Sequence, residues 1–260
     1  MLRDIVKHNL GMNKEFRPRG EQPGRLENFS DAVFALAITL LLISTSPPQT
    51  FNQLVKFTFE LFPFILCLAW LAYIWYEHFL FYYRYGVRNK NVIILNTMFL
   101  IVVLFFVYPL KFLTKLALFA ISVPFKIDWL TQDLIASVKG ADMGALMIIY
   151  GLGVSLVFFI LSLMYRYAWN NRKSLSLNEI EEFDTLTSRK GNFLMAIIPL
   201  ISVLLAILFY NYQFVGAIAG FSYFLYWPTM MVFGIQADNK RKKIVEAFNQ
   251  KENENELAQV

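Results

Sequence analysis

Residues 25–42 read RLENFSDAVFALAITLLL, and this stretch decides the fold. Charged and polar side chains occupy its first turns, and after Asp31 every side chain except Thr39 is apolar. A bilayer core is about 30 Å thick and a helix rises about 1.5 Å per residue, so about 20 mostly apolar residues cross it. The run continues to Pro47-Pro48. It predicts a membrane-spanning helix over residues 26–46.

Five more apolar runs of spanning length follow, at residues 54–83, 92–122, 143–167, 193–210 and 214–235. The chain is 57% hydrophobic and only 17% charged, whereas a soluble domain carries about a quarter charged residues. The single cysteine, Cys67, excludes a disulfide-stapled module. We predict an all-α membrane protein with six transmembrane helices per chain, of which the last two form a tight antiparallel pair.

The positive charges predict the orientation of these helices. Nineteen of the 24 Lys and Arg residues fall on one side of a six-span arrangement, and cytoplasmic loops carry the excess of positive charge. Both termini are therefore expected in the cytoplasm. The predicted division is an N-terminal arm at 1–25 with a surface helix at 1–10, a six-helix transmembrane domain at 26–236, and a polar tail at 237–260. Residues 123–141 are expected to be external or interfacial.

Features of enzymes and nucleic-acid-binding proteins are not apparent in the sequence. It has two histidines, no Cys/His cluster with metal-ligand spacing, no phosphate-binding loop and no nucleophile elbow. The net charge of +5 is explained by membrane orientation and not by nucleic acid. We therefore expect no enzymatic activity, no cofactor and no metal site.

Polar side chains within the spans are candidate functional groups, because they are costly in hydrocarbon unless paired or hydrated. Ser30 and Asp31 lie near the start of the first span, after Arg25. Glu77 and His78 lie near the end of the second span, and Asn96 lies about one turn into the third. The topology places Asp31, His78 and Asn96 at one depth. They are expected to form a cluster, either purely structural or able to sense protons through His78.

A second set of residues occupies a different face of the first span. At about 100° per residue, Leu36, Thr39, Leu40 and Ile43 form one narrow stripe, and Ser30 and Asp31 point away from it. Such a stripe faces lipid or core, or else it lines a hydrophobic pore constriction built from symmetry-related copies.

The motif Arg25-x-x-x-Phe29-Ser30-Asp31 and the apolar run after it resemble the signature of the TMEM175 potassium channels of lysosomes and prokaryotes. Trp75-x-x-His78, Asn96 and Pro109 extend the match. One motif in six spans resembles the prokaryotic form. The resemblance implies a homotetramer in the bilayer of a prokaryotic plasma membrane, conducting potassium along its symmetry axis.

The resemblance also implies roles for particular residues. The first helix of each subunit would line the pore, with Leu36 at the constriction and Thr39, Leu40 and Ile43 continuing the lining. Arg25, Ser30, Asp31, His78 and Asn96 would form the polar network that holds this helix. No Thr-Val-Gly-Tyr-Gly sequence is present, so no separate selectivity-filter loop is expected. The alternatives are a proton-coupled transporter using Asp31, Glu77 and His78, and a structural membrane protein.

Overall fold

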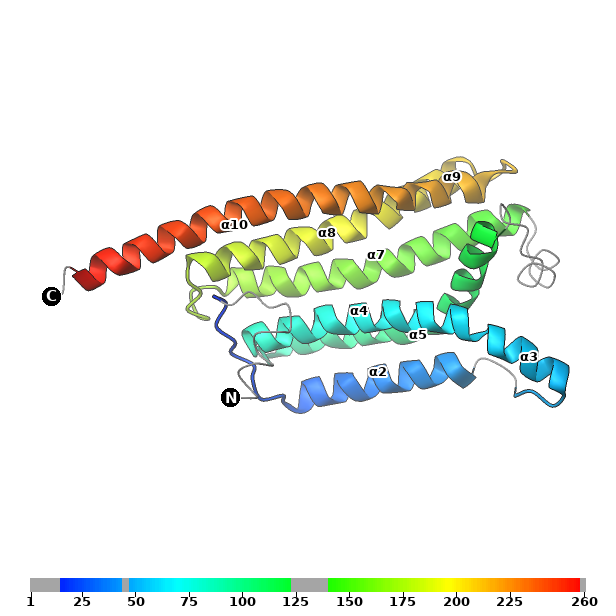
Figure 1. Cartoon of the computed structure of the whole chain (residues 1–260), viewed down its shortest axis with the longest axis horizontal. Coiled ribbons are helices and arrows are strands. Elements are labelled where there is room, and N and C mark those ends of the chain that lie inside the picture. The colour runs from blue at the N-terminus through cyan, green and yellow to red at the C-terminus, as the bar shows by residue number, and fades with distance from the viewer. Residues whose placement is uncertain (1–14, 44–46, 123–139, 258–260) are drawn as a thin grey trace.

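The computed structural model describes residues 15–43, 47–122 and 140–257, and these form long helices that run side by side (Figure 1). Six of the helices are long and apolar enough to cross a membrane, which confirms the prediction of an all-α protein with six such helices. The expected surface helix at 1–10 and nearly all of the expected external segment at 123–141 lie outside the described residues.

The first span is helix α2, Arg25–Ile43. Its start is stabilised by the carboxylate of Glu27, which accepts a hydrogen bond from the backbone N–H of Gly24 at 3.1 Å. An acidic group in the first turn satisfies a free N–H and complements the helix dipole. The last three residues of the predicted span, 44–46, lie outside the described residues.

The second apolar run is two helices, α3 (Phe51–Phe59) and α4 (Leu61–Tyr85), so the prediction of one continuous helix over 54–83 was wrong. Pro63 lies in the first turn of α4, where the missing N–H and the fixed φ of proline are tolerated. Gly86 ends α4 at φ 58° and donates its N–H to the Tyr82 carbonyl at 2.8 Å. This left-handed C-cap favours glycine.

The third and fourth spans match their predictions closely. Helix α5 covers Lys90–Ser122 and contains Pro109, and helix α7 covers Gly140–Asn170. Figure 1 shows the last turns of α5 at a steep angle to its first part. A proline inside a helix removes a backbone hydrogen bond and bends the axis.

The fifth apolar run belongs to a longer helix than predicted. Helix α8 covers Glu179–Leu208, so it begins 14 residues before the predicted start at 193. A capping box starts it: the Asn178 side chain accepts from the Glu181 N–H, and the Glu181 carboxylate accepts from the Asn178 N–H. The first twelve residues of α8 include six charged ones. We therefore place the membrane-crossing part of α8 after Lys190.

The last apolar run is interrupted. Helix α9 (Val215–Phe221) is followed by the short 3-10 segment η3 (Ser222–Leu225) and by α10 (Tyr226–Leu257). The prediction of one continuous helix over 214–235 was wrong, because η3 interrupts it. Helix α10 then continues to Leu257 through the polar residues that follow the apolar run. The short connection from Leu208 to Val215 agrees with the predicted tight pair, since α8 packs against α9.

The helices pack as one connected bundle. Helices α7 and α8 make the most extensive contact, and α5 packs against α7. Helices α2, α4 and α5 contact one another, and α10 packs against α8. Helix α2 lies at the outer edge of the bundle (Figure 1) and packs against α4 and α5. At one end of the bundle, hereafter the charged end, α2 begins, α4 ends and α8 begins.

Candidate functional site

A buried polar cluster joins the first three long helices near the charged end. Ser30 of α2, His78 of α4 and Asn96 of α5 are each at most 2% exposed. The Asn96 amide donates to Ser30 Oγ at 3.0 Å, and its carbonyl oxygen accepts from His78 Nε2 at 2.6 Å. This geometry places a proton on Nε2 of His78. The cluster satisfies three polar groups that hydrocarbon would not solvate.

Aromatic rings surround the His78 side chain. The Phe99 ring stacks on the imidazole at 5.1 Å with a 9° interplanar angle, and the rings of Tyr82 and Phe34 lie 4.9 and 5.8 Å away. The apolar rings hold the imidazole in one orientation. His78 therefore connects the polar cluster to the hydrophobic core between α2, α4 and α5.

Two of the residues expected in this network lie outside the cluster. Asp31 is exposed and accepts a hydrogen bond from Trp75 Nε1 at 2.8 Å. Arg25 is exposed and makes no hydrogen bond or ion pair with the described residues. The structure thus brings Ser30, His78 and Asn96 together, and it places Asp31 in a separate contact between α2 and α4.

The carboxylate of Glu77 also has a separate partner. It lies 3.5 Å from the Asn192 amide of α8, whereas His78 bonds to Asn96 and Asp31 bonds to Trp75. No hydrogen bond links Asp31, Glu77 and His78 to one another among the described residues. A direct relay through these three groups therefore has no continuous path in this arrangement.

The apolar stripe of α2 lies largely uncovered within one chain. Leu36 is 51% exposed and Ile43 is 70% exposed, and Thr39 is also exposed. The Thr39 hydroxyl donates to the Ala35 carbonyl of its own helix at 3.0 Å. Leu40 differs, because it is partly buried against the core. The face that carries Leu36, Thr39 and Ile43 is therefore available to another surface.

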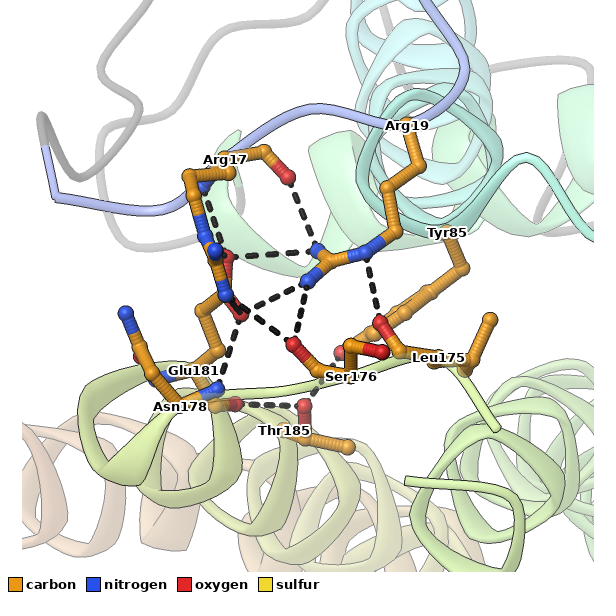
Figure 2. Close-up of polar contacts among 8 residues, drawn as sticks. All are labelled: Arg17, Arg19, Tyr85, Leu175, Ser176, Asn178, Glu181 and Thr185. Carbon is orange, nitrogen blue, oxygen red and sulfur yellow. Dashed lines mark hydrogen bonds and ion pairs between the residues drawn. The ribbon is translucent and has the colours of Figure 1, made fainter. Parts of the chain in front are cut away.

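The structure contains a second polar site that the sequence did not predict, shown in Figure 2. The fully buried carboxylate of Glu181 accepts hydrogen bonds from the guanidinium groups of Arg17 and Arg19, at 3.0 and 2.7 Å for the shortest contacts to Oε2. Arg17 also donates its backbone N–H to Glu181 Oε1 at 2.9 Å. The Arg19 guanidinium donates to the carbonyls of Leu175 and Ser176. This site ties residues 15–24, hereafter the strap, to the start of α8.

The Glu181 carboxyl has a strongly perturbed pKa. Burial alone would raise this pKa, but the hydrogen bonds from Arg17 and Arg19, with those from two backbone N–H groups, lower it to about 2. In turn, the hydrogen bond to Glu181 raises the pKa of Arg17. Both groups therefore stay charged across the physiological range.

Further contacts hold the strap across the charged end. The Arg19 and Gly20 amides donate to the carbonyls of Arg84 and Tyr83 at 3.3 and 3.0 Å. The Phe16 ring is buried, with the Arg84 guanidinium 5.0 Å from its centre, a cation–π arrangement. A Cβ at Gly20 would collide with the Tyr82 carbonyl. The strap therefore contacts the start of α8 and the end of α4, and the chain continues from it directly into the first turn of α2.

Sequence reasoning missed the strap because its partner is distant along the chain. Arg17 and Glu181 are 164 positions apart. The one local signal was the spacing of Asn178 and Glu181, which marks a capping box before an apolar helix. That pattern predicts a helix start, but it does not indicate which arginines reach it.

In the described part of the chain no group of three His, Cys, Asp or Glu side chains has metal-binding geometry.

The fold and the polar cluster define a class: an all-helical membrane protein whose first spanning helix is held by buried hydrogen bonds and exposes an apolar stripe. The family model for the endosomal/lysosomal potassium channel TMEM175 matches residues 25–106. A protein of Marivirga tractuosa described as a potassium channel is 38% identical over 247 residues, covering 94% of this chain and all of that protein. The chain belongs to the TMEM175 family of potassium channels.

A solved structure agrees with this assignment. The chain is similar to the potassium channel MtTMEM175, crystallised as a threonine-to-alanine variant with a nanobody–MBP fusion protein. The TM-score is 0.79 at 40% sequence identity, and the match covers 88% of this chain and 99% of that one.

Proposed function

We propose that this protein is a potassium-selective channel of the prokaryotic plasma membrane, that it assembles as a homotetramer, and that α2 lines its pore. The observation that carries the proposal is the position of α2. It lies at the edge of the bundle, with Ser30 buried on one side and Leu36 and Ile43 exposed on another. Four such helices around an axis would enclose an apolar constriction.

Leu36 is proposed as the constriction, with Thr39, Leu40 and Ile43 as further lining. A hydrophobic ring does not replace the hydration shell of an ion. It therefore favours the cation that loses water more easily, and potassium holds its water less tightly than sodium. The Thr39 hydroxyl lies one turn beyond Leu36 and offers an oxygen to a partly dehydrated ion. Partial burial of Leu40 against the core gives it a smaller share of the lining.

Ser30, His78 and Asn96 are proposed as the network that fixes the orientation of α2, with Arg25 and Asp31 acting at its edge. Three buried side chains from three helices leave little freedom for α2 to rotate. A fixed rotation keeps Leu36 directed to one side. Both termini are proposed to lie in the cytoplasm, because most Lys and Arg residues fall on that side.

Potassium flux in liposomes tests the function. Purified protein is reconstituted into vesicles loaded with potassium, and efflux is followed with and without an imposed proton gradient, beside empty vesicles. We expect potassium efflux down its own gradient and slower sodium efflux under matched conditions. Flux only with a proton gradient would favour the transporter alternative, and flux equal to that of empty vesicles would overturn the channel.

A further inference from the structure

A shallow groove of about 450 Å³ lies between α8 and α10. Its lining is mostly apolar and consists of one residue of α8 and five of α10, namely Leu194, Pro228, Thr229, Val232, Phe233 and Gln236. The membrane-crossing part of α8 begins after Lys190, and Leu194 lies one turn further along that helix. The groove therefore lies in the hydrocarbon region, close to the edge of the bilayer.

Helices α8 and α10 run antiparallel, and this identifies the two ends of the groove. Near the start of α10, the Tyr226 hydroxyl donates to the Met195 carbonyl at 2.7 Å. Further along α10, Arg241 pairs with Asp184, near the start of α8, at 2.9 Å. Rising residue numbers in α10 therefore correspond to falling numbers in α8. Gln236 lies at the end of the groove that is nearest the charged end of the bundle.

Two lysines, one from each helix, flank this end of the groove. Lys190 precedes Leu194 by four residues on α8, and Lys240 follows Gln236 by four residues on α10. Residues four apart share one face of a helix, so both lysines lie on the groove side. Both side chains are exposed, and neither ammonium group forms an ion pair or a hydrogen bond with the described residues.

The acidic side chains of the neighbouring turns do not neutralise these lysines. No Asp or Glu lies three or four positions before or after Lys190 or Lys240, and those positions are the neighbours on a helix surface. Asp238 lies about 160° around α10 from Lys240. Asp184 is held by Arg241. The end of the groove therefore carries positive charge directly beside an apolar surface.

The order of polarity along the groove matches the order of groups in a phospholipid. Along α10, Lys240, Gln236 and Val232 follow one another at intervals of four residues, or about 6 Å of helix each. A phospholipid presents its phosphate, its ester oxygens and its acyl chains in the same order toward the bilayer centre. From Gln236 to Pro228 the groove extends about 12 Å, within the thickness of about 15 Å of one leaflet.

We propose that the groove between α8 and α10 binds one anionic phospholipid from the leaflet at the charged end. Lys190 and Lys240 hold its phosphate, and one acyl chain lies along Val232 and Leu194. Gln236 lies between them and donates its amide to the ester oxygens. Basic side chains at the bilayer edge attract anionic lipids. Helix α10 lies on the opposite side of the bundle from α2 (Figure 1), so lipid binding does not depend on the proposed pore.

Native mass spectrometry of the purified full-length protein tests the proposal. Delipidated protein in detergent is titrated with palmitoyl-oleoyl phosphatidylglycerol and, separately, with phosphatidylcholine that has the same acyl chains. Both lipids carry a phosphate, but the choline group makes the second one neutral overall. We expect the first phosphatidylglycerol per chain to bind at least about tenfold more tightly than phosphatidylcholine. Equal affinities for the two lipids would overturn the proposal.

Charge variants locate the headgroup. Lys190→Gln and Lys240→Gln should each weaken phosphatidylglycerol binding about fivefold and leave phosphatidylcholine binding unchanged. Lys242→Gln is the matched control, because Lys242 is also exposed but lies about 160° around α10 from Lys240. We expect its affinity to equal that of the wild type. Equal weakening in all three variants would indicate attraction by net charge alone and would reject the site, as would unchanged affinity in both groove variants.

A groove-filling variant locates the acyl chain. Val232→Trp should weaken the binding of both lipids severalfold, because the larger side chain occupies the groove. Met231→Trp is the control, since Met231 and Val232 are both 53% exposed but only Val232 lines the groove. An equal effect in the two variants would reject the site.

Gel filtration in detergent shows whether each variant keeps its fold and its oligomeric state. If Val232→Trp changed the oligomeric state and left lipid binding intact, the groove would be an interface between copies of the chain, which would overturn the proposal. The titrations measure equilibrium binding without an ion gradient, so their failure is separable from failure of the proposed channel function.

Discussion

Leu36 is the residue at which the proposed pore is most sensitive. Leu36→Ala removes three carbon atoms per subunit and should widen an apolar ring at that position. We expect potassium flux to rise or persist while the preference for potassium over sodium falls severalfold, because a wider ring removes less of the hydration shell. The measurement is parallel potassium and sodium efflux from reconstituted vesicles.

Leu42→Ala is the matched control for this prediction. Leu42 is 53% exposed and lies on the same helix, compared with 51% for Leu36. At about 100° per residue the two side chains point in different directions. We expect Leu42→Ala to keep the wild-type ion preference, and an equal loss in both variants would assign selectivity to general packing of α2.

Asn96 is the residue on which the buried cluster depends, because it bonds to both other members. Asn96→Ala leaves the His78 Nε2–H and the Ser30 hydroxyl without that partner in a buried position. A buried polar group that loses its partner costs about 1–3 kcal/mol. We expect a lower unfolding temperature by differential scanning fluorimetry in detergent.

Thr97→Ala is the corresponding control. Thr97 is the next residue along α5, it is exposed, and its hydroxyl bonds to the Ile93 carbonyl of the same helix. We expect its unfolding temperature to stay within a degree or two of the wild type. If Asn96→Ala and Thr97→Ala unfolded at the same temperature, the three-residue cluster would contribute no more stability than an ordinary helix hydroxyl.

At the scale of elements, the strap and α8 act as one unit through Glu181. Glu181→Gln removes the charge that holds Arg17 and Arg19, and a hydrogen bond to a charged group contributes about 1.5–3 kcal/mol. We expect hydrogen exchange of the Arg19 and Gly20 amides to accelerate at least about tenfold. Glu179→Gln, on an exposed carboxylate two residues earlier, should leave that exchange unchanged. Retained protection in Glu181→Gln would show that backbone contacts alone hold the strap.

The same element has a defined pH dependence. The pKa of Glu181 is about 2 with the strap bound, against an ordinary value of 4.5. Because the pKa is lowered in the folded state, its stabilisation is fully present above about pH 4.5 and is lost as the pH falls toward 2. We expect strap protection to be constant between pH 7 and 5 and to fall below that window, after correction for intrinsic exchange rates. Loss of protection near pH 6 would show that a group other than Glu181 governs the pH dependence of the strap.

At the scale of the whole molecule, the proposed pore requires other copies of the chain. Leu36 and Ile43 are exposed in one chain, and a single α2 does not enclose a pore. We expect a particle of four chains by mass measurement in detergent, after subtraction of the bound detergent. A monomer or dimer that still conducts potassium would contradict a pore built from four α2 helices.

Much of the fold could be predicted from the sequence, because hydrocarbon imposes a simple length and polarity rule on every span. The six apolar runs were confirmed as six helices able to cross a membrane. The interruptions at Glu60 and at Ser222 were not predicted, because each is a single polar residue with apolar residues on both sides. The early start of α8 was also missed, since helical structure outside the bilayer carries no apolar signal.

The candidate site was likewise predictable from the sequence only in part. Helix topology placed Asp31, His78 and Asn96 at one depth and predicted a cluster of the three. The structure joins His78 and Asn96 to Ser30 instead of Asp31. The partner of Asp31 depended on which faces of α2 and α4 meet, and it is Trp75. Residues far apart in sequence decide the strap, and no local pattern indicates that Arg17 reaches Glu181.

The sequence by itself determined the solvent, the number of spanning helices and the family motif from Arg25 to Asp31, because each is a local property of composition and spacing. Only the tertiary structure decided which polar groups share a cluster and that the strap lies across the charged end. Hydrogen bonds and cavities depend on distances of a few ångström between separate helices. Those distances follow from the rotation and packing of each helix, which the order of residues along one helix does not specify.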